Sequence, residues 1–251
     1  MATFKAYFRK ERLEAIRQQR YIILAVGIIA FAIIEPFALR ILPKLLQDQI
    51  PGDIQSLFDA TPRFAINNYI KDLTQIGYLF VIFTLSGILR DEINQERLVF
   101  PYSQGANPTG MVLAKAVHYI LTLLIYILLG FIIVYYYGGM ILEGEQASIL
   151  EVVKSTLSVG MYYVFTLSLI IFLSSALKKS MVVGFTALFI SLSQSFLIKV
   201  EGIAEWLPYQ LIIYANNFTL KDSLLTFFVT ILLSILLVAL GIYRMHRAEV
   251  I

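Results

Sequence analysis

Six long apolar runs dominate this sequence and limit the folds that are open to it. A helix needs about 20 mostly apolar residues to cross the hydrocarbon core of a bilayer. Runs of suitable length and composition are Tyr21–Leu42, Leu73–Leu89, Met111–Tyr137, Lys154–Leu177, Met181–Ile198 and Ser223–Tyr243. Of the 251 residues, 59% are hydrophobic and 15% are charged, which disfavours a water-soluble domain. We predict an all-α membrane protein with six transmembrane helices in a single domain that covers residues 1–251.

The distribution of basic residues predicts the orientation of the chain in the membrane. Segments that would share a side with the N-terminus hold 13 of the 20 lysines and arginines, but only six of the 17 acidic residues. Cytoplasmic segments of membrane proteins are enriched in lysine and arginine. We therefore expect both termini in the cytoplasm, which agrees with an even number of spans.

Two stretches outside the apolar runs predict further helical structure. Thr61-Pro62 has the form of an N-cap followed by proline, and predicts a helix that continues into the second span. Residues 1–20 are basic and aromatic, with Phe4, Tyr7 and Phe8 on one helical face that Glu11 interrupts. This pattern favours a helix that lies on the inner membrane surface and is held there by anionic lipids. The alternative is a basic flank that only fixes topology.

Motifs for catalysis and nucleotide binding are missing from the sequence. Gly105–Gly110 has the glycine spacing of a Walker A loop, but Met111-Val112 stands where that loop needs lysine and a hydroxyl residue. His118 and His246 are too far apart for the H-E-x-x-H zinc motif. A chain without cysteine has no thiol nucleophile and no cysteine-ligated metal. We therefore predict that this chain is not an enzyme and binds no metal, cofactor or nucleic acid.

Polar residues inside the apolar runs are the remaining candidates for a substrate path. Glu35 precedes Pro36, which bends a helix by removing a hydrogen bond. Glu35 either lines a path or lies near the outer headgroups, paired with Arg40, and we favour the second interpretation. Gln194 and Ser191 belong to a polar run in the fifth span. They are candidates to face a substrate, although hydrogen bonds between helices explain them equally well.

The segment RDEINQERLVFPYSQGANPTGMVLAKAVHY, from Arg90 to Tyr119, separates the second and third spans on the cytoplasmic side. Its charged start predicts a helical extension of the second span. Leu98–Tyr102 is apolar and aromatic but too short to cross a bilayer. Lys115 is expected to run its aliphatic stem along the third span and place its ammonium group in water. A short amphipathic element with aromatic side chains suits docking into a groove on another protein. A solvated loop on lipid headgroups is the alternative.

These features resemble ABC-2-type permeases, the membrane subunits of ABC transporters that are encoded apart from their ATPase. The sequence YFRKERLEAIRQQRYIILAVGIIAFAIIEPFALRILPKLL is similar to the family's basic elbow helix and first span, with a Pro-containing turn and a second Leu-Pro. YIKDLTQIGYLFVIFTLSGILRDEINQERLVFPYSQGANPTGMVLAKAVHY is similar to its second span and coupling segment, where Glu92 and Lys115 match. Glu96-Arg97-Leu98 stands where the family usually has Gly-Thr-Leu, and Asn107-Pro108 replaces its Ser-Arg. The resemblance covers nearly the whole chain.

The resemblance implies two permease chains, identical or paralogous, that assemble with two ATPase subunits around a substrate path at the permease interface. ATP and Mg²⁺ would bind the ATPase and not this chain, and the transported substrate would be exported. Closure of the ATPase subunits would act on a coupling helix. The residues that the resemblance assigns to this coupling are Asp91, Glu92, Glu96, Arg97, Leu98, Phe100, Pro101 and Tyr102.

We accordingly expect a multi-pass protein of a bacterial cell membrane. Two other classes stay open. One is a secondary transporter or channel that needs no ATPase. The other is an accessory or signalling membrane protein, which would bind a partner without transport.

Overall fold

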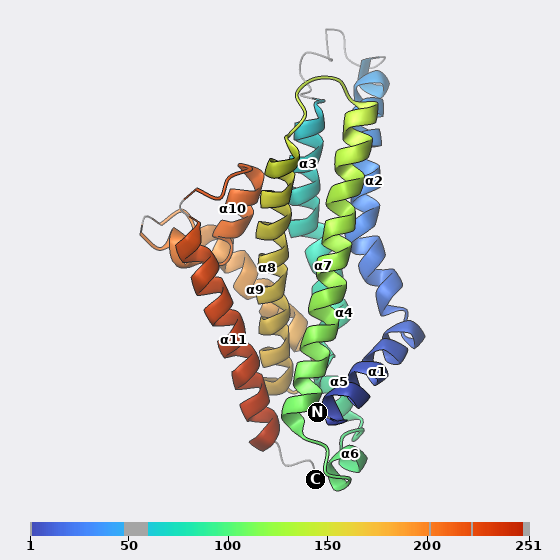
Figure 1. Ribbon diagram of the computed structural model, residues 1–251, viewed down its shortest axis with the longest axis vertical. Coiled ribbons are helices and arrows are strands. Elements are labelled where there is room, and N and C mark those ends of the chain that lie inside the picture. Colours follow the sequence, from blue (N-terminus) through green and yellow to red (C-terminus); the bar gives the residue numbers. More distant parts are fainter. Residues whose placement is uncertain (1, 48–59, 201, 222, 248–251) are drawn as a thin grey trace.

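The computed structural model describes residues 2–47, 60–200, 202–221 and 223–247, and every regular element in these ranges is helical. Six helices are long and apolar enough to span a membrane, and they run along the long axis of the molecule (Figure 1). They cover Arg20–Leu42, Pro62–Asn94, Pro108–Ile141, Ile149–Ala176, Ser180–Leu197 and Leu224–Arg247. The predicted helical transmembrane class and the number of spans are therefore confirmed.

The second span is built from four consecutive pieces. They are α3 (Pro62–Asp72), a π-helical turn (Leu73–Gly77), α4 (Tyr78–Leu85) and α5 (Arg90–Asn94). The N–H of Phe64 donates to Oγ1 of Thr61 at 3.2 Å, so the predicted helix start is confirmed. The Tyr163 hydroxyl donates to the Leu73 carbonyl at 2.7 Å and ties the π-helical turn to the centre of the bundle.

Five long helices make up the rest of the bundle. They are α2 (Arg20–Gln47), α7 (Pro108–Ile141), α8 (Ile149–Ala176), α9 (Ser180–Leu197) and α11 (Leu224–Arg247), and the short α10 (Gln210–Asn216) lies between α9 and α11 in the chain. α8 contacts α7, α9, α10 and α11, while α2 packs on the opposite flank of α7 (Figure 1). α8 is consequently the most buried span, whereas α2, α9 and α11 expose rows of apolar side chains that suit lipid or another chain.

The second span approaches α2 at backbone contact. A Cβ atom added to Gly77 would lie 2.7 Å from the Gly27 carbonyl oxygen. One added to Gly27 would lie 2.4 Å from the Cβ of Phe80. Small residues permit this approach, as they commonly do between membrane helices.

The N-terminal helix α1 (Ala2–Arg17) is separate from the spans and crosses the lower end of the bundle (Figure 1). Gln19 has a φ of 54°, in the left-handed region, and turns the chain from α1 into α2. α1 packs mainly on α7. The end of α11 reaches the same region, because Nε2 of His246 lies 3.0 Å from Oγ1 of Thr109 at the start of α7. The last helix of the described chain thus ends at the same end of the bundle as α1.

Candidate functional site

Six charged side chains meet where α1, α5 and α7 come together, and we call this group the charged junction. α1 supplies Lys10, Glu11 and Glu14, and the other members are Glu92 of α5, Arg97 of the turn before α6 (Val99–Ser103), and Lys115 of α7. Three carboxylates and three cations balance each other. The junction therefore joins the N-terminal helix, the cytoplasmic-loop segment predicted from the sequence, and the third span.

Lys115 is the centre of the charged junction. Its side chain is only 1% exposed, and its Nζ lies 2.5 Å from Oε1 of Glu11 and 2.9 Å from Oε1 of Glu92. Both carboxylates are buried as well. The prediction that Lys115 extends to water is wrong. Two carboxylates reach the ammonium group inside the bundle and replace the water it would otherwise need.

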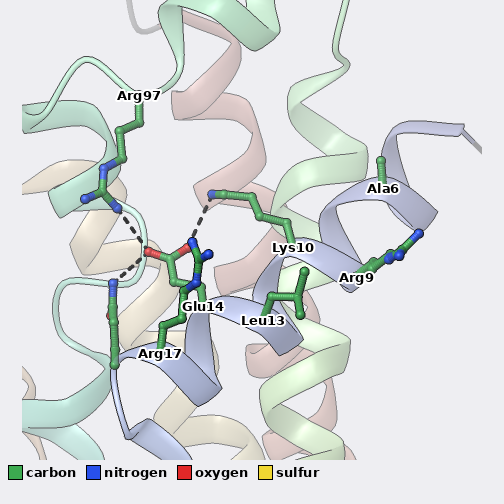
Figure 2. A pocket seen from close by; sticks show the side chains of 8 residues that line it. Ala6, Arg9, Lys10, Leu13, Glu14, Arg17 and Arg97 are labelled. Carbon is green, nitrogen blue, oxygen red and sulfur yellow. Dashed lines mark hydrogen bonds and ion pairs between the residues drawn. The ribbon is translucent and has the colours of Figure 1, made fainter.

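The outer part of the junction is formed by the more exposed cations. The Lys10 ammonium donates to Glu92 and lies 3.5 Å from Oε2 of Glu14. Arg97 donates to Oε1 of Glu14 at 3.1 Å, and Gln18 donates to the same oxygen at 2.8 Å (Figure 2). Glu14 therefore connects α1 to the turn before α6.

Burial and charge act in opposite directions at Glu11. Its removal from water raises the pKa of the carboxyl group, and the positive charge of Lys115 lowers it, with burial the larger effect. The second oxygens of Glu11 and Glu92 are buried without a hydrogen-bond partner in the described ranges. The junction is thus sensitive to the loss of any cation.

The carboxylates of Glu11, Glu14 and Glu92 converge within 4.8 Å of one another, as they would around a metal ion. The ammonium groups of Lys10 and Lys115 already lie among them. Charge neutrality is reached with the chain's own side chains, so we assign no metal to this cluster.

The other side of α5 is attached to α8 and α9. The backbone N–H groups of Leu89 and Arg90 donate to Oγ of Ser174 at 3.2 and 2.9 Å. The Ser180 hydroxyl donates to the Asp91 carboxylate. A displacement of α5 would consequently act on α1 and α7 through one face and on α8 and α9 through the other.

The segment after α5 presents one large aromatic side chain to the surroundings. α6 is a single short helix, and the Phe100 side chain on it is 74% exposed. Leu98 before α6 is buried and anchors the turn. Tyr102 is half-buried against the core, and burial raises the pKa of its hydroxyl group. The segment therefore has an anchored base and an exposed tip.

The eight residues predicted for coupling divide into three groups. Glu96, Arg97 and Phe100 are exposed. Asp91, Pro101 and Tyr102 are half-buried, whereas Glu92 and Leu98 are buried. A partner that docks on this segment would touch the first group, and the buried pair would transmit its movement. Their role in coupling stays a prediction.

The three predicted pathway residues do not form one site. Ser191 is buried on α9 and shares a hydrogen bond with the Tyr78 hydroxyl of α4. Oε1 of Gln194 accepts from the N–H of Tyr209 at 3.2 Å. Both contacts agree with the interpretation that polar groups in α9 join helices.

Glu35 lies apart from these residues, on α2. Its carboxyl group lies beside Asp72 and Asn68 of α3. The expected pairing with Arg40 is wrong, because Arg40 donates to the Ile141 carbonyl at 3.2 Å. Two acidic side chains therefore face each other between α2 and α3.

The sequence analysis missed the α1 half of the junction. We interpreted Glu11 as an interruption of an aromatic face that contacts the membrane. In the structure that face packs on α7, with Tyr7 buried and the Phe8 ring 5.3 Å from the His118 ring, so Glu11 points at Lys115. An acidic residue on a buried helical face, together with a lysine in an apolar run, was the available signal.

Comparisons with family models, with curated proteins and with solved structures found no match to this chain.

Proposed function

We propose that this chain is the permease subunit of an ABC exporter, driven by ATP hydrolysis in separate partner subunits. The observation that carries the proposal is the exposed Phe100 on α6, whose base is connected through Glu92 to buried Lys115. Such an arrangement suits a membrane protein that receives movement from a docked partner. The proposal of an ABC ATPase as the partner rests on the resemblance of the segments around Glu92 and Lys115 to ABC-2-type permeases.

The proposed cycle begins at α6. An ATPase groove would accept Phe100, and closure of the two ATPase subunits would move α6 together with the buried Leu98 beside it. Because Glu92 binds both Lys10 and Lys115, the movement would pass to α1 and to α7 without a separate linker. ATP and Mg²⁺ supply the driving force in the ATPase, and this chain supplies only docking and transmission.

The assembly requires further features that are part of the proposal. Both termini and the charged junction would lie in the cytoplasm, with α1 as the elbow helix at the inner membrane surface. A second permease chain would pack on one of the exposed apolar faces and complete the substrate path. The complex would belong to a bacterial cell membrane.

A second candidate function rests on Glu35. Two facing carboxyl groups within membrane spans are costly and often mark ion or proton pathways. Glu35 and Asp72 fit that description, and they lie beside a π-helical turn, a feature that is frequent at functional sites. A secondary transporter would depend on this pair and would need no ATPase.

Co-expression with a candidate ABC ATPase from the same genome tests the first proposal. Affinity purification of this chain should recover the ATPase, and Phe100→Ala should weaken that recovery. Trp206→Ala is the matched control, since it removes another exposed aromatic side chain outside the docking segment. Recovery that is equal for Phe100→Ala and the control would rule out docking through Phe100.

Glu92→Gln separates docking from transmission. Since Glu92 is buried, the variant should still bind the ATPase, while substrate transport per ATP hydrolysed should fall. Transport down an imposed proton gradient without any ATPase, abolished by Glu35→Gln, would instead support the secondary transporter.

A further inference from the structure

A cleft of about 580 Å³ lies between α1 and the turn before α6, beside the charged junction. Its lining includes four cations, Arg9, Lys10, Arg17 and Arg97, and a single carboxylate, Glu14. In Figure 2, Lys10, Arg17 and Arg97 point towards Glu14, and Arg9 points away from it. The cleft therefore carries an excess of positive charge that no ion pair among the described residues neutralises.

Two of these cations are free to bind a ligand. Glu14 is already occupied by Lys10, Arg97 and Gln18. Arg9 and Arg17 are exposed, and neither forms an ion pair with any residue that the structure describes. Guanidinium groups bind phosphate oxygens with paired N–H donors. The cleft is suited to a phosphate-bearing anion.

An apolar groove lies close to this cleft along the chain. It has a volume of about 410 Å³ between α2 and α4 and is lined by Ile23, Leu79, Phe80, Phe83 and Thr84. Gln18 of the cleft and Ile23 of the groove are five residues apart in the chain, on either side of the bend at Gln19. An acidic protein surface would pair with the arginines of the cleft but would leave the apolar groove without an occupant. A ligand with a phosphate head and an acyl tail fits both.

We propose that the cleft beside α1 binds the phosphate of an anionic phospholipid, with an acyl chain in the groove between α2 and α4. Basic pockets at the ends of membrane helices commonly hold such headgroups. Bound lipid would hold α1 against the bundle and would connect its position to the composition of the surrounding leaflet. The inference needs only the membrane-spanning character of the chain and is independent of any ATPase.

Native mass spectrometry of the purified full chain tests the proposal with three probes: dioleoylphosphatidylglycerol, dioleoylphosphatidylcholine and glycerol phosphate. We expect phosphatidylglycerol to be retained in preference to phosphatidylcholine. In the double variant R9Q/R17Q its Kd should rise on the order of tenfold. Lys5 and Arg12 are exposed on the same helix but do not line the cleft, so K5Q/R12Q is a control with the same change of charge.

The possible outcomes separate the sources of phosphate. Retention that falls equally in R9Q/R17Q and K5Q/R12Q would show general attraction to a basic helix and overturn the site. Glycerol phosphate that displaces the lipid at equal concentration would assign the cleft to a soluble anion and overturn the lipid. Unchanged lipid binding in R9Q/R17Q would overturn the lipid site at the cleft. A thermal midpoint for R9Q/R17Q equal to that of the unmodified chain shows that the substitutions leave the fold intact.

Discussion

Where α1 crosses α7 the buried polar groups are charged, whereas between α4, α8 and α9 they are hydroxyl groups. In the charged junction, Lys115 depends on Glu11 and Glu92, each contributed by a different helix. In the second region, which we call the hydroxyl cluster, Tyr78 contacts Ser191 and Thr166. Both groups join several helices, yet they differ in what happens when one member is removed.

The two groups differ in whether a side chain that loses its partner can find another one. An ion taken from water costs several kcal/mol, and α7, which carries Lys115, contains no acidic residue that could replace Glu11 or Glu92. A serine or threonine hydroxyl can donate to a carbonyl of its own helix. Thr166 already does so, with Tyr162 O at 3.0 Å. We therefore expect the junction to respond steeply to single substitutions and the hydroxyl cluster to respond weakly.

The largest effect is expected for Lys115→Met. The substitution removes the buried cation between Glu11 and Glu92 and leaves them with the more exposed Lys10, and loss of one partner of a buried ion pair costs about 3–5 kcal/mol. The free energy of unfolding in detergent measures this cost. Lys179→Met removes an exposed lysine and should have little effect. If Lys115→Met lowers the free energy of unfolding by less than about 1 kcal/mol, the charged junction is no more sensitive to substitution than the hydroxyl cluster.

The cost of Lys115→Met should depend on pH, because burial raises the pKa of Glu11 and Lys115 no longer opposes that effect. A carboxyl group whose folded pKa exceeds its unfolded pKa favours the folded state when protonated. Stability is then lost as pH rises through the folded pKa. The difference between the variant and the unmodified chain should therefore shrink on acidification, by about 1.4 kcal/mol for each unit of pKa difference.

Unfolding measured between pH 8 and pH 5 checks this expectation. The double variant Lys115→Met/Glu11→Gln has no carboxyl group at position 11 and should lose most of the pH dependence. A pH-independent deficit in the single variant would show that Glu11 does not carry the cost.

The spans could be predicted because their signals are local. Twenty apolar residues indicate a membrane helix wherever they occur, and Thr61 lies three residues from the N–H group that it caps. The hydroxyl cluster could be predicted only in part. The polar character of Ser191 and Gln194 indicated contact between helices, but nothing in the sequence identified Tyr78 as the partner.

The charged junction could not be assembled from the sequence. Glu11 and Lys115 are 104 positions apart, and Lys10 and Glu92 are 82 positions apart. Each charge taken alone is typical of a solvated helix end. These charges face one another only because α1 packs on α7. That packing depends on the bend at Gln19, and no glycine or proline in the sequence beside Gln19 predicts a bend there.

Tyr78→Phe tests the hydroxyl cluster directly. It removes the hydroxyl that contacts Ser191 and keeps the buried ring. Ser191 can turn to its own helix, so the loss should be about 1 kcal/mol, within the range measured for hydrogen bonds between membrane helices. Tyr136→Phe, on an exposed ring, is the control. A loss as large as that of Lys115→Met would mean that the two regions respond alike.

A smaller effect than that of Tyr78→Phe is expected for Gln194→Leu, which keeps side-chain volume and removes the acceptor for the N–H of Tyr209. One hydrogen bond between membrane helices averages about 0.6 kcal/mol, and the control Ser193→Ala should cost less, because the half-buried Ser193 donates within its own helix. Unfolding and transport are measured together on the same preparations. If Gln194 only joins helices, transport should fall no further than stability does. A Gln194→Leu protein that keeps its stability and loses the proposed transport would place Gln194 in the substrate path and would give this neutral region a role beyond joining helices.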